Sequence, residues 1–102
     1  MKRVKKIEDL EVGKYYLWQQ VADNKIRWLV IIEKIDLMNK TASATEIRLF
    51  NGTGTDFEIG EEQKADFKII KQYWFNSKLW KLYYLSDEEL SEIKEKLVLA
   101  KL

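Results

Sequence analysis

The chain has 102 residues, of which 46% are hydrophobic and 34% are charged, and its formal net charge is +1 at pH 7. This length supports one hydrophobic core and is too short for two, so we expect a single domain over residues 1–102. The sequence contains neither Cys nor His. Their absence excludes disulfides, thiolate metal sites and every catalytic arrangement built on those side chains. We therefore expect no catalytic residues, no cofactor and no metal site.

The first residues are basic but do not lead into an apolar stretch. Residues 1–6 are followed by Ile7-Glu8-Asp9-Leu10-Glu11, whereas a secretory signal needs an apolar core at this position. The longest apolar run, residues 28–32, is far too short to span a bilayer. We expect a cytoplasmic protein without membrane contact. Lys greatly outnumbers Arg and Pro is absent, a residue choice that indicates AT-rich codons, as in a low-GC bacterium or its phage.

Residues 1–13 are predicted to form an N-terminal turn whose Ile7, Leu10 and Val12 fold onto the floor of the barrel. A first strand is expected over 14–20, which is rich in Tyr and Trp. The second strand, 26–38, changes the parity of its apolar positions in the middle. Because side chains alternate between the two faces of a sheet, this change predicts a bulge or bend near Glu33.

Three further strands are expected. Residues 42–50 alternate between apolar and polar positions, as a half-buried antiparallel strand does. Asn51-Gly52 predicts a tight hairpin turn, because both of its central positions need positive φ. Short strands over 55–59 and 67–74 complete a set of five.

The C-terminal helix is predicted over residues 86–102. Ser86 and Glu89 form a capping box, and the apolar residues on either side of it, Leu85 and Leu90, occupy the positions of a hydrophobic staple. Leu90 and Ile93 begin an apolar stripe that should pack on the sheet.

The order of elements resembles an SH3-like small β-barrel of the Tudor or KOW kind. The resemblance rests on Leu10-Glu11-Val12-Gly13-Lys14-Tyr15-Tyr16, the bent strand 26–38, the Asn51-Gly52 hairpin and Phe67-Lys68-Ile69-Ile70. It implies a mainly β fold, a five-stranded antiparallel barrel over 14–74, joined by a connector (75–85) to the C-terminal helix packed on it. It indicates the fold only and names no specific family.

One segment combines Lys with aromatic side chains. Lysines neutralise phosphates and exposed rings stack on bases, so such a segment is typical of a nucleic-acid surface. The same rings are equally suited to packing the helix against the barrel. The candidate interaction surface comprises Lys68, Lys71, Tyr73, Trp74, Phe75, Lys78, Trp80, Lys81, Tyr83 and Tyr84.

Two smaller candidates come from apolar and aromatic side chains. Val98, Leu99 and Leu102 lie off the main helix stripe and form a candidate association surface, unless the helix end frays or is buried. An aromatic cage for a cation is the second candidate. Its members would be Tyr16, Trp18, Trp28 and Phe50 or Phe57, with Asp23 as the acidic partner.

The absence of catalytic side chains and the near-neutral charge favour a non-catalytic protein-binding module. A small phage or mobile-element protein that acts on a host protein would fit this description, and a homodimer is compatible with it. The alternative is a nucleic-acid-binding protein that uses the Lys and aromatic surface, with salt-sensitive binding.

Overall fold

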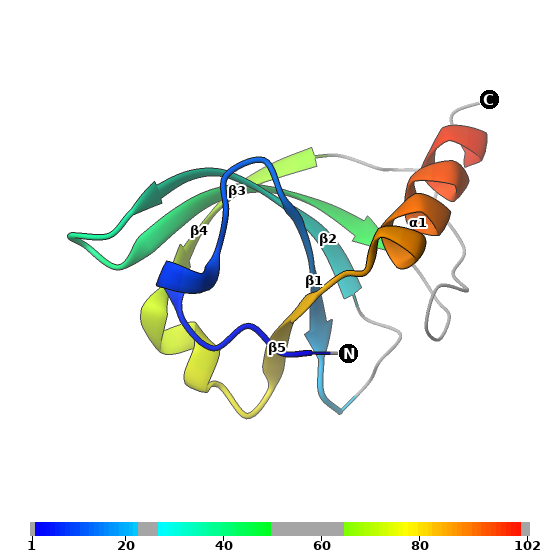
Figure 1. The fold of residues 1–102 in the computed structure, drawn as a ribbon. Coiled ribbons are helices and arrows are strands. Elements are labelled where there is room, and N and C mark those ends of the chain that lie inside the picture. The colour runs from blue at the N-terminus through cyan, green and yellow to red at the C-terminus, as the bar shows by residue number, and fades with distance from the viewer. Residues whose placement is uncertain (1, 23–26, 50–64, 101–102) are drawn as a thin grey trace.

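The fold was examined in a computed structural model, which describes residues 2–22, 27–49 and 65–100, with side chains at all of these except 48, 65, 66 and 96–100. Its elements in chain order are η1 (Ile7–Asp9), β1 (Tyr15–Gln20), β2 (Arg27–Asp36), β3 (Thr41–Leu49), β4 (Ala65–Lys71), η2 (Gln72–Asn76), β5 (Trp80–Tyr84) and α1 (Asp87–Ala100). The protein is mainly β, with one antiparallel sheet and one C-terminal helix (Figure 1). Within the described residues, no helix is long and apolar enough to cross a membrane.

The five strands form a sheet of order β4-β3-β2-β1-β5. The expected closed barrel is wrong, because β4 and β5 are the two ends of this order and do not pair with each other. The N-terminal segment instead pairs with the outer edge of β5: Val4 N–H donates to the Leu82 carbonyl, and Tyr84 N–H donates to the Lys2 carbonyl, each over 2.8 Å. Two backbone groups on the outer edge of β5, the Leu82 carbonyl and the Tyr84 N–H, are therefore already satisfied. In the segment that follows, Ile7 and Leu10 are buried as predicted, whereas Val12 is 61% exposed, so the prediction is wrong for Val12.

The bulge predicted near Glu33 is confirmed. Ile32 pairs with Ala44 and Lys34 pairs with Ser43, so Glu33 is the extra residue on β2. After it, the parity of the inward side chains changes, and Ile35 packs against the same core cluster as Ile32. The bulge thus keeps both halves of β2 apolar on one face.

The elements observed over residues 72–85 differ from the expected ones. Residues 72–74, predicted to end a strand, lie in the 3-10 helix η2, and the expected connector 75–85 contains β5. The predicted strand 55–59 and the hairpin at 51–52 lie outside the described residues.

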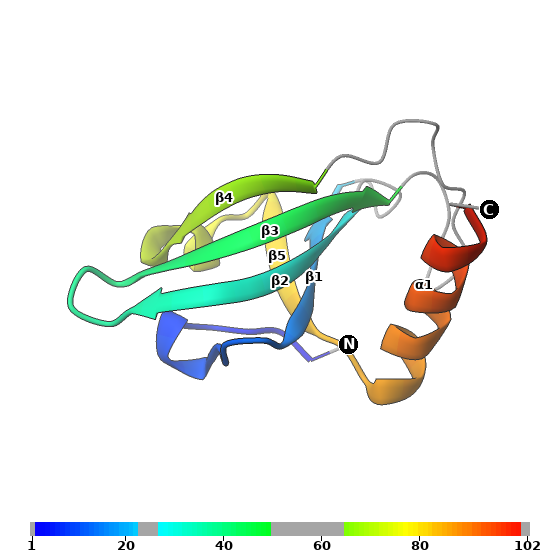
Figure 2. The ribbon, with the colours of Figure 1, turned by 90° about the horizontal axis from the view of Figure 1, so that it is seen from above.

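Each face of the sheet is covered in part, and each by a different part of the chain. On one face, side chains at even positions of β1 and β5 meet the N-terminal segment and η2, and on the other, Leu17 and Leu29 meet Ile93 of α1. Figure 2 shows α1 at the end of the sheet that lies opposite the β2–β3 hairpin. The buried members of the first cluster are Val4, Ile7, Leu10, Tyr16, Trp18, Val30, Ile32, Ala42, Ala44, Ile70, Phe75 and Leu82.

The start of α1 has the predicted capping box. Ser86 Oγ accepts a hydrogen bond from the Glu89 amide and Glu89 Oε1 accepts one from the Ser86 amide, each over 3.1 Å. Leu85 and Leu90 both pack against the second core cluster, beside buried Ile93. Leu90 and Ile93, the first two residues of the apolar stripe, therefore pack on the sheet as predicted.

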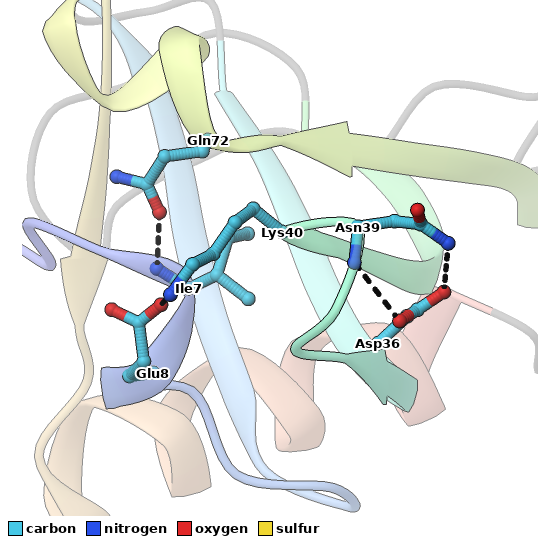
Figure 3. Close-up of polar contacts among 6 residues, drawn as sticks. All are labelled: Ile7, Glu8, Asp36, Asn39, Lys40 and Gln72. Atoms are coloured by element: carbon cyan, nitrogen blue, oxygen red, sulfur yellow. Dashed lines mark hydrogen bonds and ion pairs between the residues drawn. The ribbon is translucent and has the colours of Figure 1, made fainter.

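Polar contacts tie η1, the β2–β3 hairpin and η2 together (Figure 3). The Ile7 amide donates to Gln72 Oε1 over 3.0 Å, and the Lys40 ammonium pairs with the Glu8 carboxylate. The backbone N–H of Gln72 also donates to the backbone carbonyl of Lys40, over 3.1 Å. These contacts hold η2 from two other parts of the chain, η1 and the β2–β3 hairpin. In turn, η2 supplies one wall of the site described next.

Candidate tryptophan cleft

All four tryptophans of the chain line one open cleft of about 450 Å³. This volume is within the range of ligand-binding pockets. We call it the tryptophan cleft, and its eight lining residues are Trp18, Trp28, Lys68, Tyr73, Trp74, Asn76, Ser77 and Trp80.

Strand register brings the rings together from distant parts of the sequence. Trp18 on β1 pairs directly with Trp28 on β2. Trp80 lies on β5, the neighbour of β1 on its other side, where it pairs with Gln20. Residues with even numbers in these three strands share a face, so the three indoles point to the same side of the sheet.

The rings contact each other directly. Trp18 and Trp80 have ring planes 8° apart and centroids separated by 6.2 Å, and the Trp28 and Trp80 centroids are 5.0 Å apart with tilted planes. Trp74 of η2 lies 6.2 Å from Trp18 and meets Tyr73 edge to face at 6.2 Å. Such pairs stabilise beyond the area that they bury, so the cleft is preformed by its own ring contacts.

The lining changes from buried to exposed across the cleft. Trp18 is only 6% exposed, whereas Tyr73 is 63% exposed. The cleft thus has a buried aromatic floor and an accessible rim formed by the Tyr73 ring.

Lys68 brings the only charge among the eight lining residues that the structure describes. Its Nζ lies 3.6 Å from Glu46 Oε2 and 5.4 Å from the centroid of Trp74. Since no lining residue is acidic, a cationic ligand would meet an ammonium group without a compensating carboxylate in the lining.

Two more cations are held near the end of η2. The Lys81 ammonium donates to the Ser77 carbonyl over 2.9 Å, and an Arg3 guanidinium nitrogen donates to the Phe75 carbonyl. Burial, and then the charge of Arg3, lowers the pKa of Lys81 below its usual value. The lowered pKa therefore reflects mainly the loss of water around the Lys81 ammonium, and the positive charge of Arg3 adds to it.

The candidate interaction surface predicted from the sequence is only partly continuous. Four of its ten residues line the cleft: Lys68, Tyr73, Trp74 and Trp80. Lys78 is exposed beside the lining residue Ser77, and Lys81 lies near it as described above.

The remaining four residues of that surface lie elsewhere. Phe75 is 2% exposed and belongs to the core, Tyr84 packs half-buried against the same cluster, and Tyr83 packs against the cluster under α1. Lys71 is exposed, but strand alternation places it on the opposite face of β4 from Lys68. Alternation and burial therefore separate these four residues from the cleft.

The other predicted sites have different outcomes. Of the cage residues, Trp18 and Trp28 line the cleft, whereas Tyr16 is 1% exposed and does not. Phe50, Phe57 and Asp23 lie outside the described residues, as do Leu102 and the side chains of Val98 and Leu99. Over the part of the chain that is described, no three acidic, Cys or His side chains gather as they would around a metal ion.

Sequence reasoning missed the contribution of Asn76 and Ser77 and the joining of Trp18 and Trp28 to the aromatic segment. The alternation Trp80-Lys81-Leu82-Tyr83 was the available signal for β5.

Comparison of the chain with protein-family models, with curated proteins and with solved structures finds no match in any of the three.

Proposed function

We propose that the protein is a non-catalytic protein-binding module and that the tryptophan cleft receives a segment of its partner. The observation that carries this proposal is the gathering of all four tryptophans in one open cleft with the exposed ring of Tyr73 at its rim. Aromatic anchors in desolvated pockets provide most of the binding energy at protein interfaces. No binding site is taken from the likeness to SH3-like small barrels, because the sheet is not closed into a barrel.

A phage or mobile-element origin, with a host protein as the partner, is part of this proposal. It rests on the residue choice of the chain, in which Lys greatly outnumbers Arg and Pro is absent. The cleft itself requires only that the partner presents a short segment with an apolar or aromatic side chain.

Selection from a random peptide display library tests the proposal. The purified protein should enrich peptides that no longer bind when Tyr73 is replaced by Ala, since this ring is exposed and its loss does not disturb the core. Met38→Ala is the matched control, because Met38 is 92% exposed at the tip of the β2–β3 hairpin and does not line the cleft. If every enriched peptide bound both variants equally, the cleft would not be the binding site.

The second candidate function is binding of single-stranded nucleic acid. The position of Lys68 over Trp74 favours it, because bases stack on aromatic rings while lysines neutralise phosphates. A gel shift with single-stranded DNA and RNA at low salt tests this candidate. It predicts a shift that weakens steeply with added salt and with Lys68→Gln, and the absence of any shift would eliminate it.

A further inference from the structure

The charges of the cleft add a preference to the proposed function, on which this inference rests. The whole chain is close to neutral, yet residues 67–85 contain four Lys and no Asp or Glu. This segment supplies six of the eight lining residues of the tryptophan cleft. The segment thus gives the described lining its one charged side chain, Lys68, and places Lys81 at the carbonyl of Ser77, whereas Lys71 lies on the opposite face of β4.

We propose that the tryptophan cleft selects an acidic segment of a partner protein, one that inserts an apolar or aromatic side chain among the indoles and places carboxylates beside Lys68. The lining offers an ammonium group and several N–H and O–H donors, and it contains no carboxylate. Charged groups that match across an interface increase the association rate and disfavour partners of the wrong sign.

The surroundings of Lys68 make it suited to this role. Its side chain is 35% exposed, and its ammonium is held near Trp74 and Glu46 rather than extended into solvent. A carboxylate approaching along the cleft would therefore meet a charge of fixed position. Lys78 follows the lining residue Ser77 in the chain and is exposed.

An acidic peptide fits these observations better than a nucleic-acid strand. A strand carries a phosphate at every nucleotide and needs a continuous basic track. Here Lys81 is engaged with a backbone carbonyl, and Lys71 lies on the other face. The exposed ring of Tyr73 at the edge of the cleft suits the apolar contacts of a protein segment.

The test uses three labelled peptides of equal length with one central Phe, flanked by Glu, by Ser or by Lys. Fluorescence anisotropy should show the Glu-flanked peptide binding about 10-fold more tightly than the Ser-flanked one, and the Lys-flanked one binding most weakly. The preference should shrink as salt rises from about 50 mM to about 500 mM, because salt screens exposed charges.

Two variants of the same strand provide the matched comparison. Lys68→Gln should remove most of the preference for the Glu-flanked peptide, while Lys71→Gln, with the same loss of charge on the opposite face, should retain it. Equal effects of the two variants would overturn the role of Lys68. Far-UV circular dichroism of both variants checks that each is folded.

The remaining outcomes separate this inference from the proposed function. Peptides that bind through the cleft without any charge preference would overturn the acidic selectivity and leave the protein-binding proposal standing. If none of the three peptides nor any selected peptide bound, the protein-binding proposal itself would fail. An oligonucleotide that displaced the Glu-flanked peptide at lower concentration would identify nucleic acid as the occupant, and self-association that blocked the peptide would identify a second copy of the chain.

Discussion

The indoles of Trp18 and Trp80 lie almost parallel, with ring planes 8° apart and centroids separated by 6.2 Å. They come from β1 and β5, strands that are some sixty residues apart in the sequence and adjacent in the sheet. Trp18 is 6% exposed and belongs to the core, whereas Trp80 is half-buried. The same stack thus stabilises the fold and forms the floor of the cleft.

Replacing Trp18 should affect folding, and replacing Tyr73 should affect binding. We predict that Trp18→Ala lowers the free energy of unfolding by about 3–5 kcal/mol, because it leaves a large cavity in the core. Tyr73→Ala should change it by no more than about 0.5 kcal/mol while weakening a selected peptide by at least about 1 kcal/mol, since exposed aromatic residues at a binding site are frequent anchors. Urea unfolding and fluorescence anisotropy measure the two quantities. A wild-type unfolding midpoint for Trp18→Ala would contradict this assignment.

The bulge at Glu33 makes a prediction about the residues that follow it. Ile35 packs against the core cluster, whereas Leu37, two positions further along the chain, is 55% exposed. We predict that Ile35→Ala costs about 2 kcal/mol of unfolding free energy and that Leu37→Ala costs no more than about 0.5 kcal/mol. Equal costs in urea unfolding would show that β2 does not follow the described register.

The capping box of α1 can be tested within the helix itself. We predict that Ser86→Ala lowers the free energy of unfolding by about 1 kcal/mol, because the amide of Glu89 loses its acceptor. Ser91→Ala is the control, since Ser91 is exposed in the same helix and outside the cap. A cost for Ser91→Ala as large as that for Ser86→Ala would argue against the cap.

The pair between Glu8 and Lys40 makes a pH prediction. The hydrogen bond from Lys40 lowers the pKa of Glu8 below its usual value. The stability that the pair adds is therefore fully present above the ordinary carboxyl pKa of about 4.3 and is lost as the pH falls through the lower pKa of the folded state.

We accordingly predict that Glu8→Gln is less stable than the wild type at about pH 7 and equally stable at about pH 2. Chemical unfolding at both pH values measures this difference. The pKa of Asp36 is also lowered, by hydrogen bonds from Asn39. Asp36 is present in both proteins, so its contribution to the pH dependence of stability cancels in the difference between them. A difference that did not change with pH would mean that the charge of Glu8 adds no stability.

Local signals in the sequence predicted local features of the fold. The parity change in β2 located the bulge at Glu33, and Ser86 with Glu89 located the start of α1. Both depend on residues within a few positions of each other, where alternation and capping chemistry are decisive. The open sheet was not predictable in this way, because it depends on the N-terminal segment pairing with β5.

The cleft was predicted only in part for a similar reason. Lys68, Tyr73, Trp74 and Trp80 lie within one stretch of sequence that was singled out for its composition. Trp18 and Trp28 join them through strand pairing over long sequence separation, which no local pattern reports. Phe75 shows the opposite error, because composition alone does not distinguish a buried ring from an exposed one.

Nuclear magnetic resonance of the indole N–H groups tests the central claim most directly. The chain has four tryptophans and all of them line the cleft, so the four indole signals report on this site alone. On titration with a peptide selected by display, we predict that the indole signals shift with the same dissociation constant that anisotropy gives. Unchanged indole signals, together with shifts of backbone amides at Phe67 and Ile69 on the other face of β4, would contradict the assignment of the cleft as the binding site.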